Sequence, residues 1–155
     1  MNDYIKRILI LITFGLNAQD NNIDLKFNHQ ALLVNNLQET GDFYLNVLDF
    51  DEIFVGAGQS PPKRWFKNSE GKEIHLILQK ASIQKQPKGI HMAYSVKNIN
   101  SFIKHLNKHK VKYSNWAGET GTIQLRADGV NQIWIRDPAG YWIEINEAKY
   151  DNSRP

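Results

Sequence analysis

One pattern occurs twice in this chain, and the duplication limits the fold more than any other feature. His29 lies near the start of the segment FNHQALLV, and His91, 62 residues later, lies near the start of GIHMAYSV. A second pair of similar segments follows, EIHLIL and WIEINE, which aligns His75 with Glu144. Each half therefore supplies one candidate metal ligand near its start and one near its end. We interpret the chain as two copies of one module that hold a single metal ion between them.

Both halves predict the same order of elements: a strand, a helix and further strands. Alternating apolar residues indicate the strands, and apolar positions three or four apart indicate the helices. Asn36 and Glu39 have the spacing of a helix N-cap and its capping box. The first half is expected to contain a helix from residue 36 and strands at 27–34, 50–57, 63–67 and 72–79. The second is expected to contain a helix at 98–110 and strands at 90–96, 111–116, 124–127, 131–136 and 141–147.

Strand alternation places the candidate ligands away from the aliphatic side chains. In the predicted strand 72–79, His75 points to the face opposite the isoleucine and leucines, and Glu144 does the same in 141–147. The aliphatic faces should pack on the helices, which leaves the ligands on the concave side of the sheet. Two histidines at equivalent places in a repeat favour ligation over the commoner role of a hydrogen-bonded strand histidine. His75 is compatible with a ligand or with a group that supports one. A carboxylate such as Glu144 is costly to bury without a partner.

Composition restricts the chemistry. The 155 residues fit one domain, and 41% hydrophobic and 23% charged residues are typical of a globular protein. The chain has no cysteine, so a metal would need nitrogen and oxygen ligands. Imidazole and carboxylate suit Zn²⁺, Ni²⁺, Co²⁺, Mn²⁺ or Fe²⁺. The net charge is +3 and the basic residues are scattered, so neither nucleic acid nor a membrane is expected as a partner.

The two ends of the chain are expected to lie outside the domain. Lys6 and Arg7 precede the apolar stretch 8–16, and Ala18 offers a small residue for cleavage, as in a signal peptide at residues 1–18. We therefore expect a periplasmic or secreted mature protein, and a cytoplasmic one if this stretch is instead a first strand or helix. Residues 148–155 are polar and are predicted to form a flexible tail.

Three segments resemble the vicinal-oxygen-chelate superfamily, which includes glyoxalase I, fosfomycin-resistance thiol transferases, extradiol dioxygenases and bleomycin-binding proteins. They are NHQALLVNNLQETGDFYLNVLDFDEI, IHMAYSVKNINSFIKHL and DGVNQIWIRDPAGYWIEINE, and the likeness spans about residues 25–147. It implies an α+β fold in which two βαβββ modules form an open, cup-shaped mixed sheet around one divalent metal ion, with helices on the outer face. By this resemblance His29, His91 and Glu144 are metal ligands. Glyoxalase I typically has glutamate where this chain has His75.

The resemblance implies three alternative functions. The first is a metal-dependent lyase or isomerase that chelates two neighbouring oxygens of its substrate, with Glu144 as the base that removes a proton. The second is a non-haem Fe²⁺ dioxygenase with His29, His91 and Glu144 as ligands. The third is a small-molecule binding protein without catalysis. Arg64 and Trp142 are predicted to contact the small-molecule substrate. The chain is also expected to form a homodimer.

Overall fold

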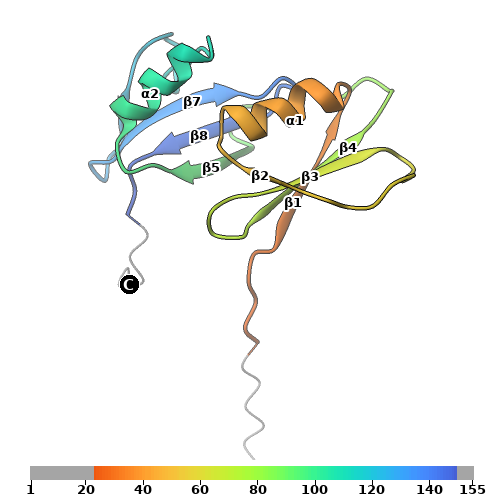
Figure 1. Cartoon of the computed structure of the whole chain (residues 1–155). Coiled ribbons are helices and arrows are strands. Elements are labelled where there is room, and N and C mark those ends of the chain that lie inside the picture. The colour runs from red at the N-terminus through yellow and green to blue at the C-terminus, as the bar shows by residue number, and fades with distance from the viewer. Residues whose placement is uncertain (1–22, 150–155) are drawn as a thin grey trace, which may run out of the picture.

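The computed structural model describes residues 23–149, which form two modules with the same order of elements (Figure 1). The first module consists of β1 (His29–Val34), α1 (Leu37–Asn46), β2 (Asp51–Ile53), β3 (Lys63–Lys67) and β4 (Glu73–Leu78). The second consists of β5 (His91–Ser95), α2 (Ile99–Lys108), β6 (Gln124–Leu125), β7 (Asn131–Arg136) and β8 (Trp142–Asn146). The predicted signal peptide, 1–18, lies outside the described residues, as do residues 150–155 of the predicted tail.

Each module forms an open four-stranded sheet, and the two sheets have the same topology. The strand order is β1-β4-β3-β2 in the first and β5-β8-β7-β6 in the second. The first strand of each module pairs in parallel with the last, and the remaining pairs are antiparallel. Figure 1 shows both helices on the same side of the sheets. The predicted α+β fold of two βαβββ modules is confirmed.

Both helices begin at an asparagine cap. The Asn36 side chain accepts a hydrogen bond from the Glu39 backbone N–H at 3.0 Å, as the sequence predicted. Asn98 caps α2 in the same way, accepting from the Ser101 N–H at 2.8 Å. Such a cap satisfies one of the free N–H groups in the first turn. The repeated cap fixes where each helix starts relative to the strand before it.

The aliphatic side chains of the strands bury one core that extends across both modules. Ile74, Leu76, Ile143 and Ile145 are almost fully buried on the helix side. The modules are also joined by polar contacts, two from a side chain to the backbone and one between side chains. These include the Tyr141 hydroxyl donating to the Leu33 carbonyl at 3.1 Å, Tyr44 with Asp137 at 3.2 Å, and His105 Nε2 with the Val47 carbonyl at 3.0 Å.

Three strand predictions were wrong: one segment is not a strand, and two strands are shorter than predicted. Residues 111–116 form no strand; only Ser114 makes isolated bridges, to Trp134 and to Thr120. The chain turns back at once through Gly118 and Gly121, whose positive φ values of 95° and 76° suit glycine. Predicted strand 50–57 ends at Ile53, where its pairing with β3 stops, and 124–127 is reduced to Gln124–Leu125. Alternation alone did not reveal that each of these stretches pairs with a neighbouring strand over only one to three residues.

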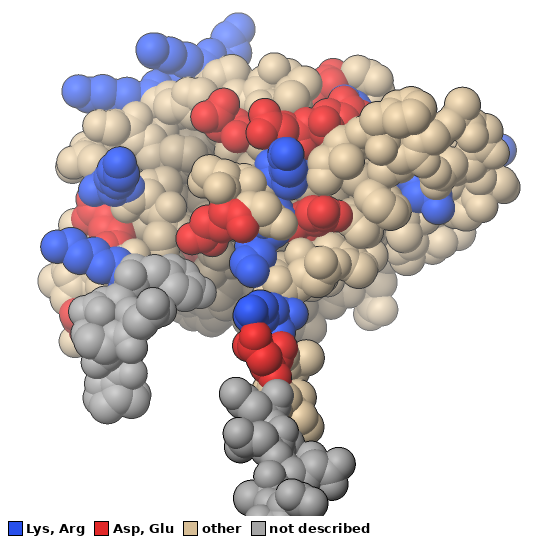
Figure 2. All heavy atoms as spheres, turned by 60° about the horizontal axis from the view of Figure 1, so that its bottom comes forward, with Lys and Arg blue, Asp and Glu red and all other residues tan. Residues whose placement is uncertain are grey.

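The surface and helix lengths add two observations. Within residues 23–149, neither helix is long and apolar enough to cross a membrane. Figure 2 shows acidic and basic side chains interspersed on the face that it presents.

Candidate metal and substrate site

The first pair of candidate ligands is a stack of rings on the first sheet. The imidazoles of His29 and His75 lie 4.2 Å apart, centre to centre, and are nearly parallel. The indole of Trp65, directly across the β3–β4 pair, stacks on the other side of His75 at 3.8 Å. The Nε2 of His75 also lies 2.7 Å from Oε2 of Glu73. His75 is thus enclosed by two rings, and one of its nitrogens already has a partner.

The second pair lies at the equivalent place on the second sheet. His91 Nε2 is 3.5 Å from Oε2 of Glu144, and the indole of Trp134 meets the His91 ring edge to face at 4.5 Å. Trp134 stands opposite Glu144 just as Trp65 stands opposite His75, and Ala93 and Ala31 are the respective neighbours on the other side. In both modules the candidate ligand on the last strand thus lies between an alanine and a tryptophan of the two neighbouring strands, so the repeat in the sequence is also a repeat in strand register.

His29 and His91 have the same nitrogen exposed for ligation. The Nδ1 of His29 lies 2.6 Å from the amide oxygen of Asn28, and the Nδ1 of His91 lies 3.0 Å from the carbonyl oxygen of Lys88. An oxygen acceptor at Nδ1 places the proton there and leaves Nε2 with a free lone pair, the usual arrangement of a metal-binding histidine. His75 differs, because its Nε2 is within hydrogen-bonding distance of a carboxylate, 2.7 Å from Glu73, whereas Nε2 of His91 lies 3.5 Å from Glu144.

Glu144 is buried but has polar partners. It is 7% exposed, and its Oε1 accepts from Asn146 Nδ2 at 2.7 Å and from Arg126 Nη1 at 3.3 Å. The guanidinium supplies the positive charge that a buried carboxylate needs. Because both donors use Oε1, Oε2 remains free on the side of His91. This orientation suits a carboxylate that binds a cation through one oxygen.

The distance between His91 and Glu144 suits two ligands of one divalent ion. A separation of 3.5 Å between His91 Nε2 and Glu144 Oε2 is what two ligands about 2.1 Å from one ion would show. The four predicted ligands nevertheless stay in two pairs, one on each sheet. Among residues 23–149, no three histidine, aspartate or glutamate side chains are grouped closely enough to hold a metal ion. The four-ligand site remains a prediction.

The two predicted substrate contacts have different surroundings. The guanidinium of Arg64 forms a double hydrogen bond with Glu52, at 2.7 Å each, and also contacts Asp42 and the Gln38 carbonyl. Hydrogen bonding to Glu52 raises the pKa of Arg64 further and lowers that of the Glu52 carboxyl. These contacts attach α1 to the first sheet. They give no support to a role in substrate binding.

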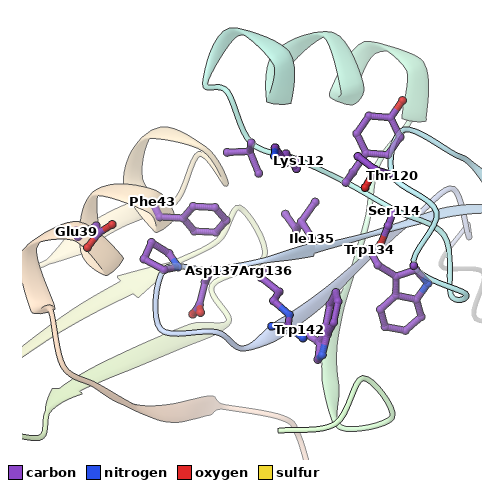
Figure 3. A pocket seen from close by; sticks show the side chains of 14 residues that line it. Glu39, Phe43, Lys112, Ser114, Thr120, Trp134, Ile135, Arg136, Asp137 and Trp142 are labelled. Carbon is purple, nitrogen blue, oxygen red and sulfur yellow. The ribbon is translucent and has the colours of Figure 1, made fainter. Parts of the chain in front are cut away.

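Trp142, in contrast, lies at the border of two cavities. It pairs with His91 across the β5–β8 ladder and is half-buried. A cavity of about 310 Å³ is lined by His91, Trp142, Ala31 and other residues of both modules. A larger one of about 460 Å³ lies between α1, β7 and the loop after α2, with Arg136 beside Trp142 at its edge (Figure 3). A candidate metal ligand, His91, lines the smaller cavity, which is therefore the better candidate for a substrate site.

The wall of the larger cavity also carries a donor without a partner. The indole N–H of Trp134 is buried and has no hydrogen-bond partner among the described residues. A buried donor without a partner is costly and often marks a functional site. Arg126, Lys88 and Asn146 were not expected at the site from the sequence. Only Asn146 could have been found, since it shares the Glu144 face of its strand.

Comparisons with known proteins agree with this fold. A duplicated βαβββ unit, with histidine and carboxylate donors on the strand faces turned away from the helices, defines a class of two-module folds that place small-molecule sites on their sheets. Residues 26–145 match the Glyoxalase/Bleomycin resistance protein/Dioxygenase superfamily, and the chain belongs to that superfamily. A search of curated protein sequences gives no match.

Several solved structures share the fold at low identity. A putative glyoxalase family protein from Bacillus anthracis is 20% identical, with a TM-score of 0.63 over 96% of this chain and 100% of that one. The oxidase ChaP-H2 is 17% identical, with a TM-score of 0.66 over 85% and 100%. A mutant of the Listeria monocytogenes fosfomycin resistance protein FosX, complexed with Mn(II) and 1S,2S-dihydroxypropylphosphonic acid, is 15% identical, with a TM-score of 0.66 over 83% and 95%. At these identities the likeness shows the fold.

Proposed function

We propose that this protein is a metal-dependent enzyme that binds a small molecule through two neighbouring oxygens. The observation that carries the proposal is the matched state of His29 and His91, each with Nδ1 hydrogen-bonded to oxygen and Nε2 free. Together with Oε2 of Glu144 these atoms would supply two imidazoles and one carboxylate, which the chain keeps on two separate sheets. A divalent ion held there would act as a Lewis acid on the substrate oxygens.

The contacts of Glu144 bear on the reaction type. A lyase or isomerase would use this carboxylate as a base, which requires it to leave the cation and approach a substrate proton. Its Oε1 is held by Arg126 and Asn146, which favours a fixed ligand. Two histidines and one fixed carboxylate suit non-haem Fe²⁺. This observation supports a dioxygenase as the second candidate beside the lyase or isomerase.

The remaining residues would shape the substrate site. His75, stacked between Trp65 and His29, would orient the His29 ring rather than bind the ion. Trp142 lines the smaller cavity beside His91, and its ring meets the Arg136 guanidinium at 4.0 Å. The buried N–H of Trp134, which has no partner among the described residues, belongs to a residue that lines the larger cavity.

We also propose that two copies of the chain complete the site. One cation needs donors from both modules, but a single chain keeps them as two pairs on separate sheets. In the described residues β1 and β5 are both edge strands, so each has an unpaired backbone edge next to its histidine. A symmetric dimer would place the first sheet of one copy against the second sheet of the other.

Metal analysis tests the enzyme proposal. The protein is purified anaerobically, and Fe, Mn, Co, Ni and Zn are measured in the wild type and in His91→Ala. Near-stoichiometric metal in the wild type and little in the variant is expected. Fe with activity lost in air would favour the dioxygenase, whereas Mn, Co, Ni or Zn would favour the lyase or isomerase. Equal and negligible metal in both proteins, even after loading, would leave a non-catalytic binding protein as the better description.

Mixing two inactive variants tests the dimer. His29→Ala and His91→Ala are unfolded together, refolded together and loaded with Co²⁺. If sites form between copies, mixed dimers have one intact site, and about a quarter of the wild-type Co²⁺ sites should return. Each variant refolded alone is the control. No recovery from a mixture that sedimentation shows to contain dimers would place the whole site within one chain.

Export of the mature chain is a separate proposal, which rests on residues 1–18. Expression of the full chain with a C-terminal tag in a Gram-negative host, followed by cell fractionation, should give a shortened periplasmic form. A full-length cytoplasmic product would contradict it, and Lys6→Glu with Arg7→Glu is the control that should block export.

A further inference from the structure

Lys88, in the segment between the modules, ends in a cage of three tryptophans. Its ammonium nitrogen lies 4.4 Å from the ring centre of Trp142, 5.7 Å from Trp134 and 5.9 Å from Trp116. It also donates to the backbone carbonyls of Asn115 and Trp116, at 2.9 Å each. Cation–π attraction and two charge-assisted hydrogen bonds therefore act on one ammonium group. Partial burial and the nearby Arg136 guanidinium lower the pKa of this group.

The other end of the same residue contacts a candidate ligand. The backbone carbonyl of Lys88 accepts from Nδ1 of His91 at 3.0 Å. This is the contact that leaves Nε2 of His91 free and directed to Glu144. One residue thus holds the loop at 115–116 with its side chain and the imidazole with its main chain.

The surrounding residues show that this arrangement is specific to Lys88. Lys80 and Lys85, in the same linker, are exposed and make no hydrogen bond or ion pair to the described residues. Without an anchor, the main chain near residue 88 would be free to move relative to β5. The carbonyl would then hold His91 only part of the time, and the imidazole could exchange between its two neutral tautomers.

We propose that Lys88 is a positioning residue for His91. Its ammonium attaches the linker to the loop at Asn115 and Trp116, and its carbonyl thereby keeps the His91 ring in the tautomer that offers Nε2 to a cation. The effect of Lys88 on metal affinity rests on the proposed metal site, but the tautomer of His91 can be measured without metal. Partners of this kind typically contribute about 10- to 100-fold to metal affinity.

The test compares Lys88→Met with wild type. Methionine keeps the apolar stem and the backbone carbonyl but removes the charge and all three donors. In metal-free protein at about pH 8, above the ordinary histidine pKa, ¹⁵N NMR should show one His91 tautomer, protonated at Nδ1, in the wild type. Lys88→Met should show a mixture. Its affinity for Co²⁺, measured by titration calorimetry, should fall by about tenfold.

Three further variants make the result decisive. Lys88→Arg, which keeps charge and donors, should restore most of the tautomer preference, and Lys85→Met should match the wild type. Trp116→Leu removes one exposed wall of the cage and should give a smaller shift toward a mixture of His91 tautomers. This variant replaces Lys88→Met in the test if Lys88→Met does not fold. A folded Lys88→Met with the wild-type tautomer would overturn the inference. If wild-type protein binds no Co²⁺, the proposed function fails while the tautomer result still decides the role of Lys88.

Discussion

The hydroxyl of Tyr44 donates a hydrogen bond to Oδ2 of Asp137 at 3.2 Å, and both groups are buried. Tyr44 lies on α1 of the first module, whereas Asp137 begins the turn between β7 and β8 of the second. The other carboxylate oxygen accepts from the Tyr141 N–H at 2.8 Å, within the same turn. The turn Asp137-Pro138-Ala139-Gly140, which lies in one of the three segments that resemble the superfamily, therefore also joins the two modules.

This contact predicts a pH dependence of stability. Burial, only partly offset by hydrogen bonds, raises the pKa of Asp137 from 3.8 to about 6. A raised folded-state pKa means that the folded chain holds the proton more tightly than the unfolded one. The contribution of Asp137 to the free energy of unfolding should therefore fall as pH rises from about 4 to about 6, by at most about 3 kcal/mol, and stay level above that.

Asp137→Asn removes this titration and is the variant to compare. Urea unfolding of wild type and variant is measured at several pH values between 4 and 7. The free energy of unfolding of the wild type should fall relative to that of the variant as pH rises from about 4 to about 6. Asp51→Asn, an exposed strand residue, should leave the wild-type slope unchanged. Parallel curves for wild type and Asp137→Asn would mean that the carboxyl titrates near its ordinary pKa in the fold.

Glu144→Gln should weaken metal binding without unfolding the protein. The amide has nearly the same shape and can still accept from Asn146, but it lacks the charge that Oε2 offers to a cation. Because loss of a supporting partner alone costs about tenfold or more, we expect Co²⁺ affinity to fall by more than about tenfold. Titration calorimetry measures this, with the exposed turn variant Glu70→Gln as control. An unchanged affinity would remove Glu144 from the ligand set.

His75→Phe separates the two roles predicted for His75. Phenylalanine preserves a ring between Trp65 and His29 but has no nitrogen to bind an ion. If the imidazole only supports His29, Co²⁺ affinity should stay within about threefold of wild type, whereas His29→Ala should lose more than about tenfold. An equal loss in both variants would identify His75 as a fourth ligand and would favour the four-ligand arrangement expected from the sequence.

Arg64→Gln should affect stability and leave metal binding intact. The substitution breaks the double hydrogen bond to Glu52 and the contact with Asp42, so α1 loses its attachment to β2 and β3. A loss of about 1–3 kcal/mol in the free energy of unfolding is expected in a urea titration. Lys63→Gln, next to it on the same strand, is the control. Wild-type stability combined with impaired substrate binding would support the role predicted from the sequence.

The sequence determined the modules and the faces of their strands. The repeat around His29 and His91 defined two equivalent units, and the period of two in a strand is enough to decide that His75 and Glu144 point away from the aliphatic residues. The cap at Asn36 was equally readable, because a helix N-cap depends only on residues within one turn. Each of these features is local, so neighbouring residues alone specify it.

The tertiary structure decided which side chains meet. Arg126 reaches Glu144 from 18 residues away, and Lys88 reaches the carbonyls of a loop 27 and 28 residues ahead; no period in the sequence encodes either contact. Arg64, expected at a substrate, is held instead by Glu52 and Asp42. Residues 111–116 alternate like a strand, but only Ser114 exchanges backbone hydrogen bonds with β7, through Trp134. Charges and backbone donors are satisfied by whatever the fold brings within about 3 Å of them, and only the packed chain determines that.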